Sequence, residues 1–118
     1  MYGVPANLPL KRFINVELNQ IALGQFQIQF HFAGAGSISV ESKWELRNIE
    51  GEIVDQEIDH TSRQDYRVHY IIDQKVVSYD INPPSSFTLH FKNGFSLTIY
   101  DDSEQYESFS IHPDNMYI

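Results

Sequence analysis

Apolar and polar side chains alternate along most of this 118-residue chain, and a repeat of two residues is typical of a β-strand with one buried face. In the first half, the alternation predicts four strands, over residues 14–18, 26–32, 37–46 and 52–58. The first is expected to end where Asn19 and Gln20 interrupt it, and Ser42 is the one polar residue at an inward position of the third. Residues 48–51 predict the turn into the last strand of this half, which is expected to be an edge strand.

The second half repeats this pattern and predicts four more strands, over residues 77–81, 86–92, 95–101 and 106–111. Pro83 and Pro84 end the first of them, because proline cannot donate to a strand ladder. Asn93-Gly94 between two alternating runs predicts a two-residue type I′ turn, in which both central residues need a positive φ. The buried face of this hairpin is expected to consist of Phe87, Leu89, Phe91, Phe95, Leu97 and Ile99.

These seven or eight short strands predict one all-β antiparallel domain over residues 1–118, either a sandwich or a partly closed barrel. The pattern does not decide between these two architectures. Residues 61–72 are the one ambiguous stretch, where Tyr66, His69, Tyr70 and Ile72 would share one face of a short helix. We find no linker or clear repeat, so no second domain is expected.

The charge balance narrows the choice of partners. Sixteen acidic residues oppose eight basic ones, which gives a net charge of −8. Such a surface repels nucleic acid and anionic lipid, and it speeds encounter with a basic protein. Acidity that only keeps the protein soluble is an equally simple explanation. No apolar run approaches the ~18 residues of a membrane span, there is no cysteine, and residues 1–10 lack the apolar core of a secretory signal, so a cytoplasmic location is expected.

Residues that carry catalytic or metal chemistry are scattered. The five histidines have no metal-ligand spacing, and although His31 and His90 could meet across a sheet, solvated imidazoles are the commoner explanation. Ser85 and Ser86 lack the context of a nucleophile, and no glycine-rich dinucleotide loop is present. A carboxylate pair in the acidic turn after residue 100 could in principle act as acid and base, but a solvated turn explains it better. We therefore expect no enzyme activity, no cofactor and no metal.

Residues 87–102, followed by Tyr106-Glu107-Ser108, show a strand, an Asn-Gly turn, a second strand and a Tyr-Glu-Ser step into the last strand. This pattern resembles a group of small bacterial immunity-type proteins of polymorphic toxin and contact-dependent growth inhibition systems. Residues 23–32, with Gly24-Gln25-Phe26-Gln27, are similar more weakly. The resemblance implies a protein that binds and neutralises a cognate toxin domain, and it assigns no catalytic residue.

Two acidic segments compete for the role of the toxin-binding surface. Residues 41–59 hold seven acids, and residues 76–118 hold six, and each segment sums to −5. The second is favoured because its acids cluster beside two tyrosines that can anchor a partner. The partner-binding residues predicted there are Tyr100, Asp101, Asp102, Glu104, Tyr106 and Glu107. The alternatives left open are a small-ligand-binding β-barrel, suggested by the aromatic content, and, ranked last, a hydrolase.

Overall fold

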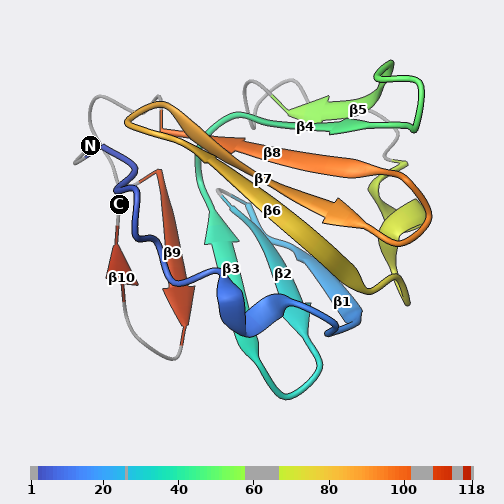
Figure 1. Ribbon diagram of the computed structural model, residues 1–118, viewed down its shortest axis with the longest axis horizontal. Coiled ribbons are helices and arrows are strands. Elements are labelled where there is room, and N and C mark those ends of the chain that lie inside the picture. Colours follow the sequence, from blue (N-terminus) through green and yellow to red (C-terminus); the bar gives the residue numbers. More distant parts are fainter. Residues whose placement is uncertain (1–2, 26, 58–66, 102–107, 113–115, 118) are drawn as a thin grey trace.

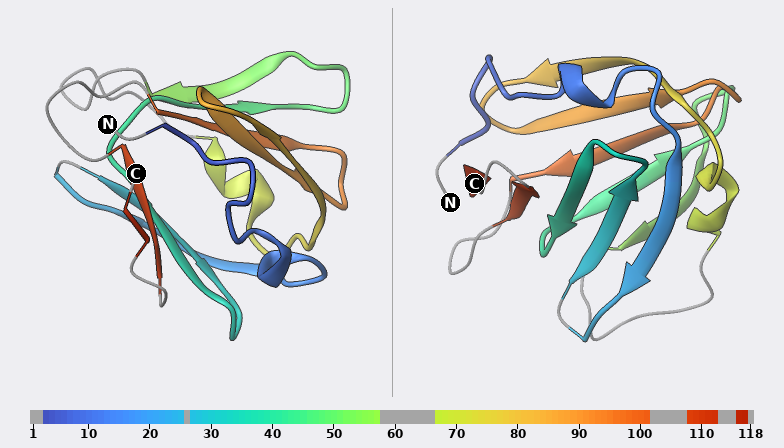
Figure 2. Two further views of the ribbon diagram at one scale, coloured as in Figure 1. Left: turned by 60° about the vertical axis from the view of Figure 1, so that its left-hand side comes forward. Right: turned by 90° about the horizontal axis from the view of Figure 1, so that it is seen from below.

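The computed structural model describes residues 3–25, 27–57, 67–101, 108–112 and 116–117. The strands in these segments form two five-stranded antiparallel sheets that face each other (Figure 1, Figure 2). This confirms the all-β prediction and decides for the sandwich rather than the closed barrel. Within the described residues, no helix is long and apolar enough to cross a membrane.

Each sheet gathers strands from both halves of the chain. The first sheet has the order β1 (Leu18–Leu23), β2 (Ile28–Phe32), β3 (Gly36–Val40), β9 (Phe109–His112) and β10 (Met116–Tyr117). The second has the order β5 (Ile53–Glu57), β4 (Trp44–Arg47), β8 (Ser96–Tyr100), β7 (Ser86–Phe91) and β6 (Val76–Asn82). The predicted return strand after the 48–51 turn is confirmed as β5, an edge strand.

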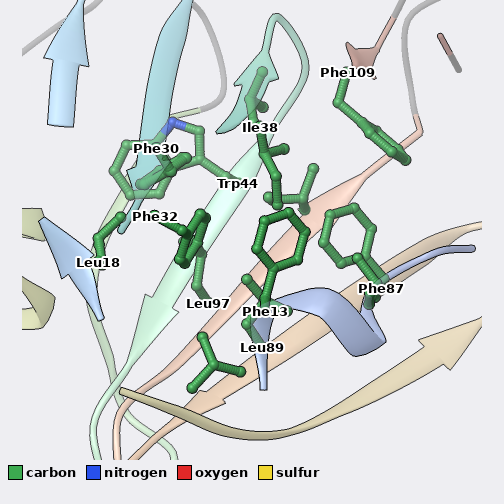
Figure 3. Packing of buried hydrophobic residues seen from close by; sticks show 14 of the residues in the cluster. Phe13, Leu18, Phe30, Phe32, Ile38, Trp44, Phe87, Leu89, Leu97 and Phe109 are labelled. Atoms are coloured by element: carbon green, nitrogen blue, oxygen red, sulfur yellow. The ribbon is translucent and has the colours of Figure 1, made fainter. Parts of the chain in front are cut away.

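The space between the sheets is filled by large side chains that point toward one another (Figure 3). Phe30 of the first sheet meets Trp44 of the second edge-on, with 6.3 Å between ring centroids. Phe13 is the last residue of the short 3-10 helix η1 (Lys11–Phe13). Its ring packs against that of Phe32, with 4.6 Å between the ring centroids. Because these aromatic rings are almost wholly buried, they occupy the interior that a ligand-binding barrel would keep open.

The predicted strand over residues 37–46 is wrong as one element. The chain leaves the first sheet after Val40 and enters the second at Trp44. The backbone N–H groups of Glu41 and Ser42 both donate to the carbonyl of Ser108, at 2.8 and 3.0 Å. The even-numbered residues face inward on both sides of this crossing, so alternation alone gives no sign that the sheet changes.

The first strand is also placed differently from the prediction. Strand β1 runs through Asn19 and Gln20 instead of ending there, and an irregularity between Leu18 and Gln20 keeps both Leu18 and Ile21 on the inner side. A second irregularity, in β6 between Val76 and Ser78, leaves Val77 48% exposed. In both strands, an extra residue shifts the alternation that the sequence pattern treats as continuous.

The predicted short helix near 61–72 is present in the described part as the 3-10 helix η3 (Val68–Ile71). Its buried residues are Val68 and Ile71, whereas His69 and Tyr70 are exposed, so the expected apolar face was wrong. A 3-10 helix repeats every three residues, and the spacing of Val68 and Ile71 fits that period. Tyr66 lies outside the described residues.

The β7–β8 hairpin confirms the predicted register, with Leu89 opposite Leu97 and Phe87 opposite Ile99. Of its six predicted inward residues, five are buried and Phe95 is half-buried. The two-residue turn is wrong, because Phe91 and Phe95 close a three-residue loop and only Gly94 has a positive φ, of 92°. Asn93 acts through its side chain, which accepts a hydrogen bond from the Phe95 N–H and donates to the Tyr70 carbonyl.

Glycine is required at position 94 for two reasons: its φ of 92° is in the left-handed region, and a side chain there would collide with Ile49. A Cβ at this position would lie 2.9–3.0 Å from side-chain atoms of Ile49, whereas at Gly51, with φ 85°, nothing lies within 4 Å. We expect Gly51→Val to cost about 1–2 kcal/mol of unfolding free energy from the left-handed backbone alone. Gly94→Val should cost more, and Ile49→Ala in that background should recover part of the difference. Urea unfolding measures all three; equal losses for the two glycine variants would contradict the close contact.

Candidate partner-binding site

Two of the six predicted partner-binding residues, Tyr100 and Asp101, lie in the part of the chain that the structure describes. They stand at the end of β8, where the chain leaves the second sheet. The other four lie outside the described residues: Asp102, Glu104, Tyr106 and Glu107. The described geometry therefore concerns Asp101 and Ser108, the two residues that flank the acidic segment 102–107 and that we call its base.

Asp101 is buried and its carboxylate points inward. One oxygen accepts the Ser108 hydroxyl at 2.6 Å, and the other accepts the backbone N–H of Gly3 at 2.7 Å. The Asp101 N–H donates in turn to the Ser85 carbonyl at 2.8 Å. Because Asp101 and Ser108 flank the acidic segment, their hydrogen bond holds the two ends of that segment together. Asp101 thus has a structural role, because both of its carboxylate oxygens accept hydrogen bonds from within the chain.

Tyr100 points the other way, onto the outer face of the second sheet, and joins a cluster on β4 and the residue before it. Its hydroxyl donates to Oε1 of Glu45, and Arg47 lies 3.4 Å from Oε2 of the same carboxylate. The ammonium group of Lys43 lies 5.0 Å from the centroid of the Tyr100 ring. We refer to Lys43, Glu45, Arg47 and Tyr100 as the outer cluster.

The outer cluster hides its one carboxylate. Glu45 is only 5% exposed although it lies on the solvent side of the sheet, because Tyr100 and Arg47 bond to both of its oxygens. Burial of the phenol and its hydrogen bond to Glu45 raise the pKa of Tyr100 to about 12. The cluster therefore presents an aromatic ring and two cations beside the acidic segment, and it adds no free negative charge.

The period-two run Lys43, Glu45, Arg47 was the available sequence signal for this cluster, since it puts all three on one face. The alternation does not say that β8 is their neighbour, so their meeting with Tyr100 was missed. On β7 and β8 the outward positions other than Tyr100 are polar, and Thr88 is hydrogen-bonded to Thr98 at 2.8 Å.

The two histidines considered as a metal pair lie on different sheets. His31 bonds to Gln29 on β2 at 3.1 Å, and His90 bonds to Asp80 across β6 and β7 at 2.6 Å. No group of three histidine, cysteine or acidic residues suited to a metal ion occurs in the described ranges.

Negative charge is concentrated in a few stretches of the sequence. The segments 58–66, 102–107 and 113–115 contain six of the sixteen acidic residues but only one of the eight basic ones, Arg63. They thus carry −5 of the net −8. The described part of the chain, with ten acidic and seven basic residues, carries only −3. Most of the excess negative charge therefore belongs to these three short stretches of the sequence.

Comparison with family models, with curated proteins and with solved structures finds no match to this chain.

The structural role of Asp101 is testable. Asp101→Asn keeps the size of the side chain but offers one accepting oxygen to two donors, and we expect a loss of about 1–3 kcal/mol of unfolding free energy. Asp80→Asn is the matched control, because the Asp80 side chain is 78% exposed, and it should change stability by less than about 0.5 kcal/mol. Equal effects in chemical unfolding would show that the Gly3–Asp101–Ser108 contacts contribute little.

The raised pKa of Tyr100 predicts a dependence of stability on alkaline pH. A tyrosine titrates near pH 10 when unfolded, so the stability linked to the neutral phenol is complete below about pH 10 and is lost as the pH rises toward about 12. Between pH 8 and pH 11, the urea midpoint of the wild type should therefore fall further than that of Tyr100→Phe. Parallel falls in both proteins would contradict this assignment.

Proposed function

We propose that this protein is an immunity-type inhibitor that binds a basic toxin domain and blocks its active site. The observation that carries the proposal is the pair of hydrogen bonds that Asp101 accepts from Gly3 and Ser108, next to segment 102–107. That segment contains three acidic residues and no basic one. The resemblance of residues 87–108 to immunity proteins of toxin systems supports the same function. An inhibitor of this kind needs no chemistry of its own, so we propose no enzymatic activity.

A fixed base matters because ordering a segment costs free energy when it binds. About 1–2 kcal/mol is lost for each residue whose backbone becomes fixed. Joining residues 101 and 108 within the folded domain meets part of that cost in advance, since the segment enters and leaves the framework at fixed points. Asp102, Glu104 and Glu107 all belong to the segment between these two fixed points.

The chemistry of the partner follows from charge. Many toxin domains are nucleases, and a nuclease holds phosphate in a cationic cleft. Carboxylates can occupy such a cleft in place of substrate, and complementary charge also raises the rate of association. Tyr100, at the edge of the same segment, offers a partly exposed ring as an anchor.

The competing acidic segment, residues 41–59, is less suited to this role. Glu45 is buried against Arg47, and Asp55 accepts the backbone N–H of Arg67 at 2.5 Å. Glu50 and Glu52 are exposed, but they lie at the β4–β5 turn, at the opposite end of the β4–β8 pair from Tyr100. These acids are dispersed, whereas those of segment 102–107 follow one another along six residues.

The small-ligand alternative has less support. A ligand-binding barrel needs an enclosed apolar interior, and here the space between the sheets is packed with buried aromatic and aliphatic side chains. The described chain does form a hollow of about 590 Å³ beside the β2–β3 turn, but it lies open to solvent. Its wall includes Arg12, His112 and the small residues 33–36.

Two matched double variants test the proposed surface. Asp102→Lys/Glu104→Lys and Glu50→Lys/Glu52→Lys change the net charge equally, from −8 to −4. The first pair should abolish protection of cells that express the cognate toxin and should weaken binding by about 2–5 kcal/mol for each carboxylate buried against a cation. The second pair should still protect and should change mainly the rate of association.

Circular dichroism and urea unfolding of both variants serve as folding controls. Full protection by a folded Asp102→Lys/Glu104→Lys variant would place the binding surface elsewhere. Equal loss of protection in the two variants would show that only total charge matters.

A further inference from the structure

The loop between β7 and β8 contains the only Asn-Gly pair in the sequence, Asn93-Gly94. Asn93 is exposed, and its side chain folds back over the peptide that follows it, because Oδ1 accepts the Phe95 N–H at 3.2 Å. The nitrogen of the same amide, Nδ2, donates to the Tyr70 carbonyl at 3.3 Å. The Asn93 amide thus joins this loop to η3 and lies beside a glycine peptide.

The side-chain carbonyl carbon of an asparagine, Cγ, can be attacked by the backbone nitrogen of the next residue. Glycine at that position leaves the nitrogen uncovered, and it also gives the backbone the freedom that ring closure needs. Gly94 is such a residue, and its φ is 92°. Its N–H donates to the Phe91 carbonyl at 2.9 Å, so this hydrogen bond has to open before the nitrogen can react.

We propose that Asn93 is a site of spontaneous deamidation in the folded protein. The Gly94 nitrogen gives up its proton and bonds to Cγ of Asn93, while the Cγ–Nδ2 bond breaks and ammonia leaves with that proton. The product is a five-membered cyclic imide. Water then opens the ring at either of its two carbonyl carbons, which gives aspartate or isoaspartate at position 93.

Asn48 provides a comparison within the same chain. Its Oδ1 accepts the backbone N–H of Glu50, two residues further on, at 3.0 Å, and also that of Glu52. The side chain is therefore folded over the next peptide as in Asn93. The residue that follows is Ile49, whose branched and stiff side chain shields the peptide nitrogen and restricts the backbone. Asn48 is accordingly expected to stay intact.

Deamidation of Asn93 would weaken the contact between the loop and η3. An aspartate still accepts the Phe95 N–H, but it has no N–H to donate, so its carboxylate would lie against the Tyr70 carbonyl. Isoaspartate in addition lengthens the backbone of the three-residue loop by one carbon atom. The modification should therefore lower the stability of the fold. It lies at the opposite end of β8 from Tyr100, so it does not depend on the proposed toxin surface.

Peptide mass spectrometry tests the reaction. One sample of the purified protein is kept folded in mildly alkaline buffer, and a second is unfolded in guanidinium chloride. The folded Asn93 peptide should gain the mass that separates an acid from an amide, more slowly than in the unfolded sample, while the Asn48 peptide stays unchanged. The proposal is overturned if folded Asn93 remains intact over the time that completes its conversion in denaturant, or if Asn48 converts as fast as Asn93.

Two encoded substitutions test the consequence. Asn93→Asp removes the donor to Tyr70 and is expected to lower the urea midpoint by roughly 0.5 M. Asn48→Asp is the matched control, because it adds the same charge but keeps the oxygen that accepts both backbone N–H groups, and its midpoint should change little. Equal losses in the two variants would show that the contact with η3 does not make position 93 sensitive to deamidation.

Discussion

Ser108 is the residue on which the arrangement of the two sheets depends. It is fully buried, and its carbonyl accepts the N–H groups of Glu41 and Ser42 where the chain crosses from the first sheet to the second. Its hydroxyl donates to Asp101, which in turn holds Gly3. One serine thus connects the crossing between the sheets, the N-terminal segment and both ends of the acidic segment. A larger or apolar side chain here would leave the buried Asp101 carboxylate short of a donor.

The sequence predicted those parts of the fold in which alternation runs on without a change of phase. The register of the β7–β8 hairpin and the edge strand β5 follow from such runs. Prediction failed where an extra residue shifts the alternation, as at Asn19 and Val77, and where the chain changes sheet without any shift, as at Ser42. At these places the decisive contacts, such as the Ser108 carbonyl on the crossing, come from residues far away in the chain.

The candidate site shows the same division. The pattern marked a cluster of acids after Tyr100, but it treated Asp101 as one more exposed acid. Only the positions of Gly3 and Ser108 show that this carboxylate is turned inward. The outer cluster was likewise visible as a polar face on β4, while its closure over Glu45 by Tyr100 depends on the β4–β8 pairing.

The division of charge along the sequence supports the proposed mode of action, in which a folded domain of low net charge carries short acidic segments that bind a basic partner. Affinity capture from the native host at low salt, followed by expression of each captured protein alone and together with this chain, tests that account most directly. The account predicts a basic protein that salt releases, that arrests growth when expressed alone and that this chain renders harmless. Capture of no such protein, or of partners whose toxicity is unchanged by co-expression, would contradict it.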